Sequence, residues 1–129
     1  MELFGFRLLV KDFAAALQFW RDVMKLSLQF QDETLGYAYF DTGKVGLELM
    51  RHDGFAAAIG ESTPVPVPQG RQVVIDFRVD NVDITYAELI AQGATSVSTP
   101  QDRPEWRART AHIADPDGHV IEIYTSLPA

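Results

Sequence analysis

Two carboxylates stand at matching positions in two similar segments of the sequence. Residues 40–50 read FDTGKVGLELM and residues 114–124 read ADPDGHVIEIY, so each segment has Asp, then Gly, then a strand-like run containing one Glu. These residues, Glu48 and Glu122, stand where strand alternation otherwise favours an apolar side chain. Carboxylates in such places can bind a cation or act as general acids and bases.

The elements around these segments follow the same order in both halves of the chain. A strand-like run comes first, then a segment with apolar residues at i, i+3, i+4 and i+7, and then three short strand-like runs. Asp12 and Gly93 are placed to begin the first helix and end the second. The predicted strands cover residues 4–10, 26–31, 36–41, 45–50, 73–79, 94–99, 107–114 and 119–124, and the predicted helices cover 13–26 and 80–93.

We therefore predict one domain, residues 1–129, built of two βαβββ modules. The first module covers residues 1–52 and the second covers 71–129. Residues 53–70 contain a Pro-x-Pro-x-Pro pattern, which is incompatible with a central strand, and are interpreted as the linker.

Composition narrows the classes of function. The chain has 129 residues, of which 47% are apolar and 22% charged, and this balance is typical of a globular protein. Its net charge of -7 argues against nucleic acid binding. No apolar run approaches the ~20 residues that span a bilayer, and no signal sequence is evident, so we expect a cytoplasmic protein without membrane contact. The absence of cysteine excludes disulfides and thiolate chemistry.

Two motifs link this repeat to a known family. The run DPDGHVIEI, residues 115–123, and the strand–helix signature VKDF…FWRDVMKL resemble the vicinal oxygen chelate superfamily. That superfamily includes glyoxalase I, extradiol dioxygenases, fosfomycin resistance proteins, methylmalonyl-CoA epimerase and bleomycin resistance proteins. The resemblance implies an α+β fold in which the two modules form a partly closed, cup-shaped barrel, the glyoxalase/bleomycin resistance fold.

The resemblance also implies where a metal would bind. In relatives, the first and last strands of each module each supply one ligand, usually His or Glu. Glu48 and Glu122 match the last-strand positions, whereas Gly5 and Val74 stand at the first-strand positions and offer no ligand side chain. Two carboxylates alone favour at most a weakly held Mg²⁺ or Mn²⁺. We therefore expect no metal cofactor, with Glu48 and Glu122 as the ligands if a divalent metal does bind.

Strand alternation predicts which charges share the cup with these carboxylates. The alignment that pairs Gly5 with Val74 places Arg7, Asp76 and Arg78 on the inner face. We expect Arg7 and Arg78 to form charge-assisted pairs with Glu48 and Glu122. The alternative is that both arginines reach solvent at the strand ends.

Two further residues are candidates for a ligand site. His112, in a predicted strand, either faces the cup as an acid or base or has a structural role. Trp106 belongs to the predicted loop 99–109, where it either stacks on a planar or cationic ligand or packs over the barrel mouth.

Three classes of function remain open from the sequence. The favoured one is a metal-independent small-molecule-binding protein, similar to bleomycin-resistance-type members, that takes a planar or cationic ligand in the cup. The second is a glyoxalase-like lyase or isomerase, or a dioxygenase-like enzyme, with Glu48, Glu122 or His112 as catalytic candidates. The third is a module for partner contacts, against which the polar interior argues. The resemblance also implies a homodimer.

Overall fold

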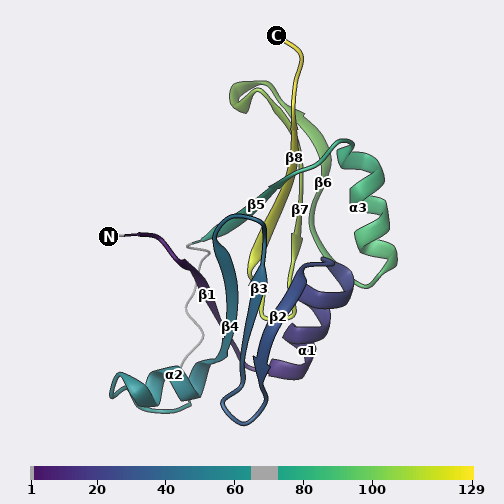
Figure 1. The fold of residues 1–129 in the computed structure, drawn as a ribbon. Coiled ribbons are helices and arrows are strands. Elements are labelled where there is room, and N and C mark those ends of the chain that lie inside the picture. Colours follow the sequence, from purple (N-terminus) through teal and green to yellow (C-terminus); the bar gives the residue numbers. More distant parts are fainter. Residues whose placement is uncertain (1, 65–72) are drawn as a thin grey trace. The chain divides into compact units, whose positions relative to one another are not determined.

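The computed structural model describes residues 2–64 and 73–129. The chain divides into two compact units, Met1–Gln69 and Gly70–Ala129, each with its own four-stranded mixed sheet (Figure 1). No hydrogen-bonded ladder between described residues joins the two sheets. The α+β class and the repeated order of strand, helix and three strands are as predicted.

The sheet of unit 1 has the order β1-β4-β3-β2, with β1 parallel to β4 and the other neighbours antiparallel. Its four strands are β1 (Gly5–Val10), β2 (Ser27–Asp32), β3 (Tyr37–Asp41) and β4 (Gly46–Arg51). Successive side chains of a strand point to opposite faces of the sheet, and one of these faces is apolar and buried. Its buried side chains are Leu8, Val10, Ala38, Phe40, Leu47 and Leu49.

A helical segment supplies the other half of this core. Asp12 caps helix α1 (Phe13–Gln18) by accepting a hydrogen bond of 3.0 Å from the Ala15 N–H, as its position predicts. The predicted single helix then changes to the π-helix η1 (Phe19–Val23). The buried side chains of this segment are Phe13, Ala16, Leu17, Phe19 and Trp20.

The segment 53–70, expected as a linker, begins as a helix. Helix α2 (His52–Ala58) covers its first residues, because the run FAAA favours helix and Ala56 is buried to 1% exposure. Pro66 and Pro68 of the Pro-x-Pro-x-Pro pattern lie outside the described residues.

The sheet of unit 2 repeats this topology, in the order β5-β8-β7-β6. Its four strands are β5 (Val74–Arg78), β6 (Thr95–Arg103), β7 (Ala108–Ala114) and β8 (Val120–Ser126). Helix α3 (Val82–Ala91) completes the unit, and its buried Val82 and Leu89 belong to the same apolar core as Ile113 and Ile123.

Most of the predicted loop 99–109 is regular structure. Strand β6 continues to Arg103, and the short 3-10 helix η2 (Pro104–Trp106) joins it to β7. Pro100 is tolerated because β6 is an edge strand and its register shifts between Ser98 and Gln101. The candidate Trp106 therefore lies at the tip of a paired hairpin.

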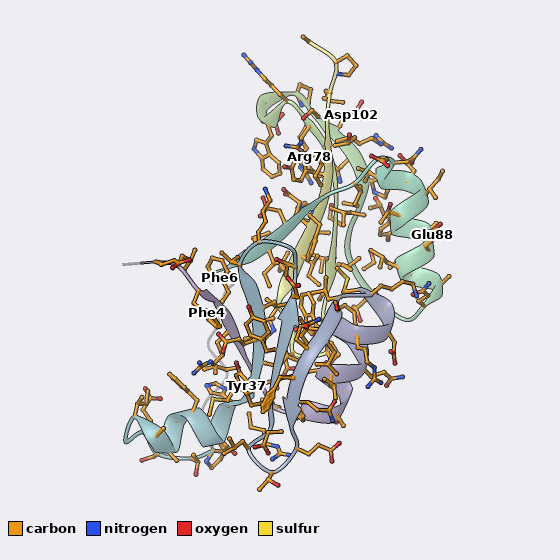
Figure 2. All side chains as sticks on the ribbon, in the orientation of Figure 1. Phe4, Phe6, Tyr37, Arg78, Glu88 and Asp102 are labelled. Atoms are coloured by element: carbon orange, nitrogen blue, oxygen red, sulfur yellow. The ribbon has the colours of Figure 1, made fainter. Side chains whose placement is uncertain are left out.

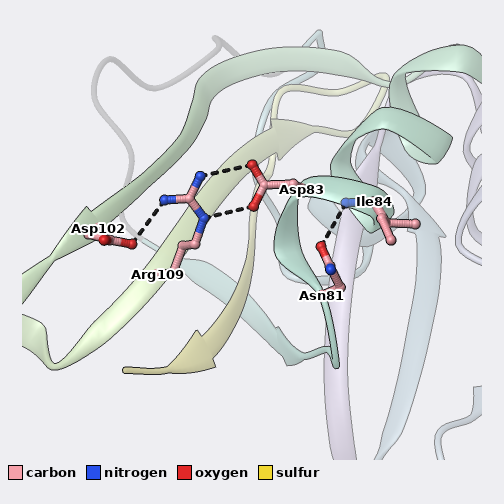
Figure 3. Close-up of polar contacts among 5 residues, drawn as sticks. All are labelled: Asn81, Asp83, Ile84, Asp102 and Arg109. Atoms are coloured by element: carbon pink, nitrogen blue, oxygen red, sulfur yellow. Dashed lines mark hydrogen bonds and ion pairs between the residues drawn. The ribbon is translucent and has the colours of Figure 1, made fainter. Parts of the chain in front are cut away.

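Polar contacts attach α3 to its sheet at one end. Asn81 caps the helix by accepting from the Ile84 N–H at 3.0 Å. Arg109 of β7 donates to both oxygens of Asp83 at 2.7 and 2.8 Å and to Asp102 of β6 at 2.9 Å (Figure 3). These contacts explain how the start of the helix is positioned over β6 and β7.

In the described part of the chain, no helix has the length and apolar character needed to cross a lipid bilayer.

Candidate functional site

Polar and aromatic side chains gather on the face of each sheet opposite its apolar core. In unit 1, the parallel register places Arg7 of β1 directly beside Glu48 of β4. Tyr37 of β3 reaches the same carboxylate across the sheet. In unit 2, the register places Asp76 and His112 on either side of Glu122. Each unit thus has one candidate cluster built around one of the two matching glutamates.

The carboxylate of Glu48 is buried and accepts several hydrogen bonds at one of its oxygens. Glu48 is 5% exposed, and its Oε1 accepts hydrogen bonds from Arg7 Nε at 3.3 Å and Arg7 Nη2 at 3.1 Å. The Tyr37 hydroxyl donates to the same oxygen at 2.5 Å, and the Arg7 guanidinium lies 5.7 Å from the Tyr37 ring centroid. The predicted pairing of Arg7 with Glu48 is present. A charged neighbour and two donors offset the cost of burying this carboxylate.

Tyr37 is a residue that the sequence reasoning missed. Burial, and then its hydrogen bond to Glu48, raise the pKa of the Tyr37 phenol to about 12. The phenol therefore stays protonated at neutral pH and serves as a fixed donor. Alternation from Tyr39, which lies opposite Glu48, would have placed Tyr37 on this face.

Glu122 has a different partner from the one predicted. Its Oε1 lies 2.9 Å from Nε2 of His112, and both side chains are largely buried, with 19% and 13% exposure. Arg78 instead lies opposite Tyr124 in the register, with its guanidinium 6.0 Å from the Tyr124 ring centroid (Figure 2 labels Arg78 on β5). The expected Arg78–Glu122 pair is therefore wrong, because the residue opposite Glu122 is Asp76.

A hollow of about 380 Å³ lies on this face of unit 2. Its lining residues are Asp76, Trp106, Ala108, Glu122 and Tyr124. Trp106 is 55% exposed, and the Arg103 guanidinium lies 4.8 Å from its ring centroid. Arg103 is held there by a 3.0 Å hydrogen bond to the buried Thr110 hydroxyl. The hollow thus combines two carboxylates with two aromatic rings.

The residues of the two clusters fit a metal chelate poorly. Among residues 2–64 and 73–129, no group of three or more His, Asp or Glu side chains is placed to hold a metal ion. Glu48 already accepts from Arg7 and Tyr37, and Gly5 and Val74 supply no side-chain donor. Transition metals favour several nitrogen or sulfur ligands, which this donor set lacks.

A family model identifies the superfamily to which the chain belongs. Residues 3–123 match the model of the Glyoxalase/Bleomycin resistance protein/Dioxygenase superfamily. The chain belongs to this superfamily. The sequence resemblance is thereby confirmed.

Individual relatives and solved structures match nearly the whole chain. The uncharacterized protein YraH of Bacillus subtilis strain 168 is 36% identical over 128 residues, which are 98% of this chain and 100% of YraH. A glyoxalase/bleomycin resistance protein/dioxygenase from Nocardioides has a TM-score of 0.85 at 24% identity, covering 100% of this chain and 85% of that one. A lactoylglutathione lyase from Agrobacterium tumefaciens has a TM-score of 0.73 at 21% identity, covering 95% and 92%. Superfamily membership does not by itself name a ligand or a reaction.

Proposed function

We propose that this superfamily member is a metal-independent small-molecule-binding protein whose unit 2 hollow takes a planar or cationic ligand. The observation that carries the proposal is the lining of the hollow by Asp76, Glu122, Trp106 and Tyr124. Aromatic faces attract cations and stack on planar rings, and carboxylates add charge complementarity. A volume of about 380 Å³ lies in the range of ordinary ligand sites.

The charges around the hollow support a cationic ligand. Glu122 is in contact with His112. In contrast, no hydrogen bond or ion pair joins Asp76 to another described side chain. Asp76 is thus free to pair with an incoming cation. Metal independence is proposed because the donor set fits a chelate poorly.

The test is isothermal titration calorimetry of the full chain with proflavine, a planar aromatic cation, after dialysis against EDTA. We expect saturable binding that Asp76→Asn and Trp106→Ala each weaken about tenfold, because a charge-assisted pair or a stacked ring is lost. Asp80→Asn is the matched control, since Asp80 is exposed and does not line the hollow. Equal affinity of the wild-type and Asp76→Asn proteins, or binding that depends on an added divalent metal, would contradict the proposal.

A second candidate function is catalysis of the glyoxalase type. The observation that favours it is the 2.9 Å contact between His112 and Glu122, because a carboxylate that orients an imidazole is a common acid–base arrangement. Formation of lactoylglutathione from methylglyoxal and glutathione, assayed with added Ni²⁺, Zn²⁺ or Mn²⁺, would support it. If these two residues carry the reaction, Glu122→Gln and His112→Asn should each lose that activity.

A cytoplasmic homodimer is part of the same proposal. Exposed apolar side chains on and beside β1, Phe4 at 67% and Phe6 at 53% exposure, support a contact with a second copy (Figure 2). Light scattering after size exclusion should give twice the chain mass of 14.4 kDa. Phe6→Glu should shift the protein to monomer, and a monomeric wild-type protein would refute the dimer.

A further inference from the structure

We infer a second ligand site, on the helical side of unit 1, that takes a small organic carboxylate with an apolar body. A groove of about 490 Å³ runs along α1 and η1, on the side of the sheet where those helical segments pack. Its lining residues are Phe13, Ala14, Leu17, Gln18, Arg21, Glu33 and Arg51. None of them belongs to the clusters around Glu48 and Glu122.

The floor of the groove is apolar. Phe13 and Leu17 are buried with 5% and 7% exposure, and Ala14 beside them is exposed. Small hydrocarbon groups resting on these side chains leave water, which favours binding in proportion to the apolar area covered. The amide of Gln18 adds a neutral donor and acceptor at the rim.

Arg51 carries the specificity of the groove. Its guanidinium lies 5.7 Å from the Phe13 ring centroid, and it makes no hydrogen bond or ion pair with any other described side chain. A guanidinium offers a planar pair of donors that matches a carboxylate. Arg51 is therefore an oriented cation without a counter-ion in a chain whose net charge is -7.

The hairpin that joins β2 to β3 positions this arginine. The Arg51 backbone N–H donates to the Gly36 carbonyl at 2.9 Å, and the Arg51 side chain crosses directly over Gly36. A Cβ at Gly36 would lie 2.5 Å from Arg51 Cγ, so a larger residue would push the arginine side chain aside, and the φ of +68° favours glycine there. The close approach limits where the guanidinium can go.

The other charged residues of the groove have different roles. Arg21 is already paired with Asp22, with contacts of 2.8 and 3.0 Å, so it contributes little net charge. Glu33, on the β2–β3 turn, has only a 3.5 Å contact with Gln31 and opposes an anion. Affinity for a carboxylate should therefore depend on Arg51, rise when Glu33 is neutralised and be nearly indifferent to joint removal of the Arg21–Asp22 pair.

The experiment is a titration of the ¹⁵N-labelled full chain with benzoate, followed through backbone amide shifts, with benzyl alcohol as the uncharged comparison. We expect saturable shifts in α1 and near Arg51 and Glu33, with benzoate binding about tenfold more tightly than benzyl alcohol. Arg51→Gln should remove that preference and Glu33→Gln should tighten benzoate binding. The double variant Arg21→Gln/Asp22→Asn, which keeps the net charge, should leave it within about twofold.

Three outcomes would overturn the inference. They are equal binding of benzoate and benzyl alcohol, unchanged benzoate binding in Arg51→Gln, and no saturable shift in α1. Arg51 is exposed, so Arg51→Gln should fold normally. Unchanged amide shifts away from the groove would verify this. Asp76→Asn serves as a second control, since it alters the hollow of unit 2 and should leave benzoate binding to this groove unchanged.

Discussion

At the scale of residues, the two matching glutamates have acquired different partners. Glu48 is held by a permanently charged arginine and by a phenol, whereas Glu122 is held by an imidazole. The first arrangement neutralises a buried carboxylate at all ordinary pH values. The second leaves a carboxylate and an imidazole beside an open hollow. The glutamate of unit 1 is therefore buried against its partners, whereas the glutamate of unit 2 lines a hollow.

We predict that Tyr37→Phe lowers the free energy of unfolding by about 1–3 kcal/mol near neutral pH, because a hydrogen bond to a charged group is lost. The folded pKa of about 12 lies above the ordinary tyrosine value of 10, so the protonated phenol is the form that the fold favours. Its contribution is complete below pH 10 and fades as the pH rises towards 12.

Urea denaturation of the wild type and of Tyr37→Phe measures the difference in their free energies of unfolding. Ultraviolet titration of the tyrosines should show one late-ionising group in the wild type that Tyr37→Phe lacks and Tyr86→Phe retains. A wild type whose tyrosines all ionise together near pH 10 would disprove the assignment.

At the scale of elements, the DPDG turn before β8 is held by one aspartate. Asp115 is 3% exposed, and its Oδ1 accepts from the N–H groups of Asp117 and His119 at 3.1 and 2.7 Å. Its Oδ2 lies 2.7 Å from Nδ1 of His119. The motif that marks the superfamily thus makes the turn that starts the Glu122 strand.

The His119 contact makes the stability of this turn depend on pH. The hydrogen bond to Asp115 raises the pKa of His119 above its ordinary value of 6.5, so the charged imidazole is favoured in the fold. The contribution is complete below pH 6.5 and is lost as the pH rises through the raised pKa. We predict that His119→Gln destabilises the protein more at pH 5.5 than at pH 9.

Chemical denaturation of both proteins at the two pH values measures this difference. His52→Gln is the control, because His52 begins α2 and has no aspartate partner among the described residues. A loss of stability in His119→Gln that is the same at both pH values would contradict the prediction.

At the scale of the whole molecule, each unit has its own sheet and its own buried apolar side chains. In unit 1 the core includes Trp20, Phe40 and Leu49, each with 0% exposure. Close packing of this kind leaves little room for the structure to relax when a side chain is shortened. The face of each sheet opposite its apolar core can therefore carry charged side chains, because burial on the apolar face stabilises the fold.

We predict that Leu49→Ala lowers the free energy of unfolding by about 2–5 kcal/mol, through lost burial and the cavity that remains. Leu35→Ala, at a position that is 61% exposed, should change it by less than about 0.5 kcal/mol. Denaturation followed by fluorescence compares the two variants. Equal effects of both substitutions would show that Leu49 is not a core residue.

Patterns among residues close in the sequence were sufficient to predict most helices and strands and to identify the superfamily. Strand alternation, the Asp12 cap and the DPDG turn are decided by neighbours in sequence, so they could be predicted without a structure. The pairing of Arg7 with Glu48 also followed, because strand alternation placed both side chains on the same face. Helix α2 and the continuation of β6 to Arg103 did not follow, since proline-rich patterns obscured helix propensity and edge-strand pairing.

Which side chains meet across strands depends on the pairing of strands that are distant in the sequence. Register set Asp76, not Arg78, opposite Glu122, and brought in His112 from the next strand. A change of two residues in register keeps every side chain on the same face, so alternation alone cannot distinguish these pairings. The sequence alone was enough to predict two carboxylates at matching strand positions, on the side of each strand opposite its apolar residues. The hydrogen-bonded pairing of the strands determined that one is closed off by arginine and tyrosine and the other lines a hollow.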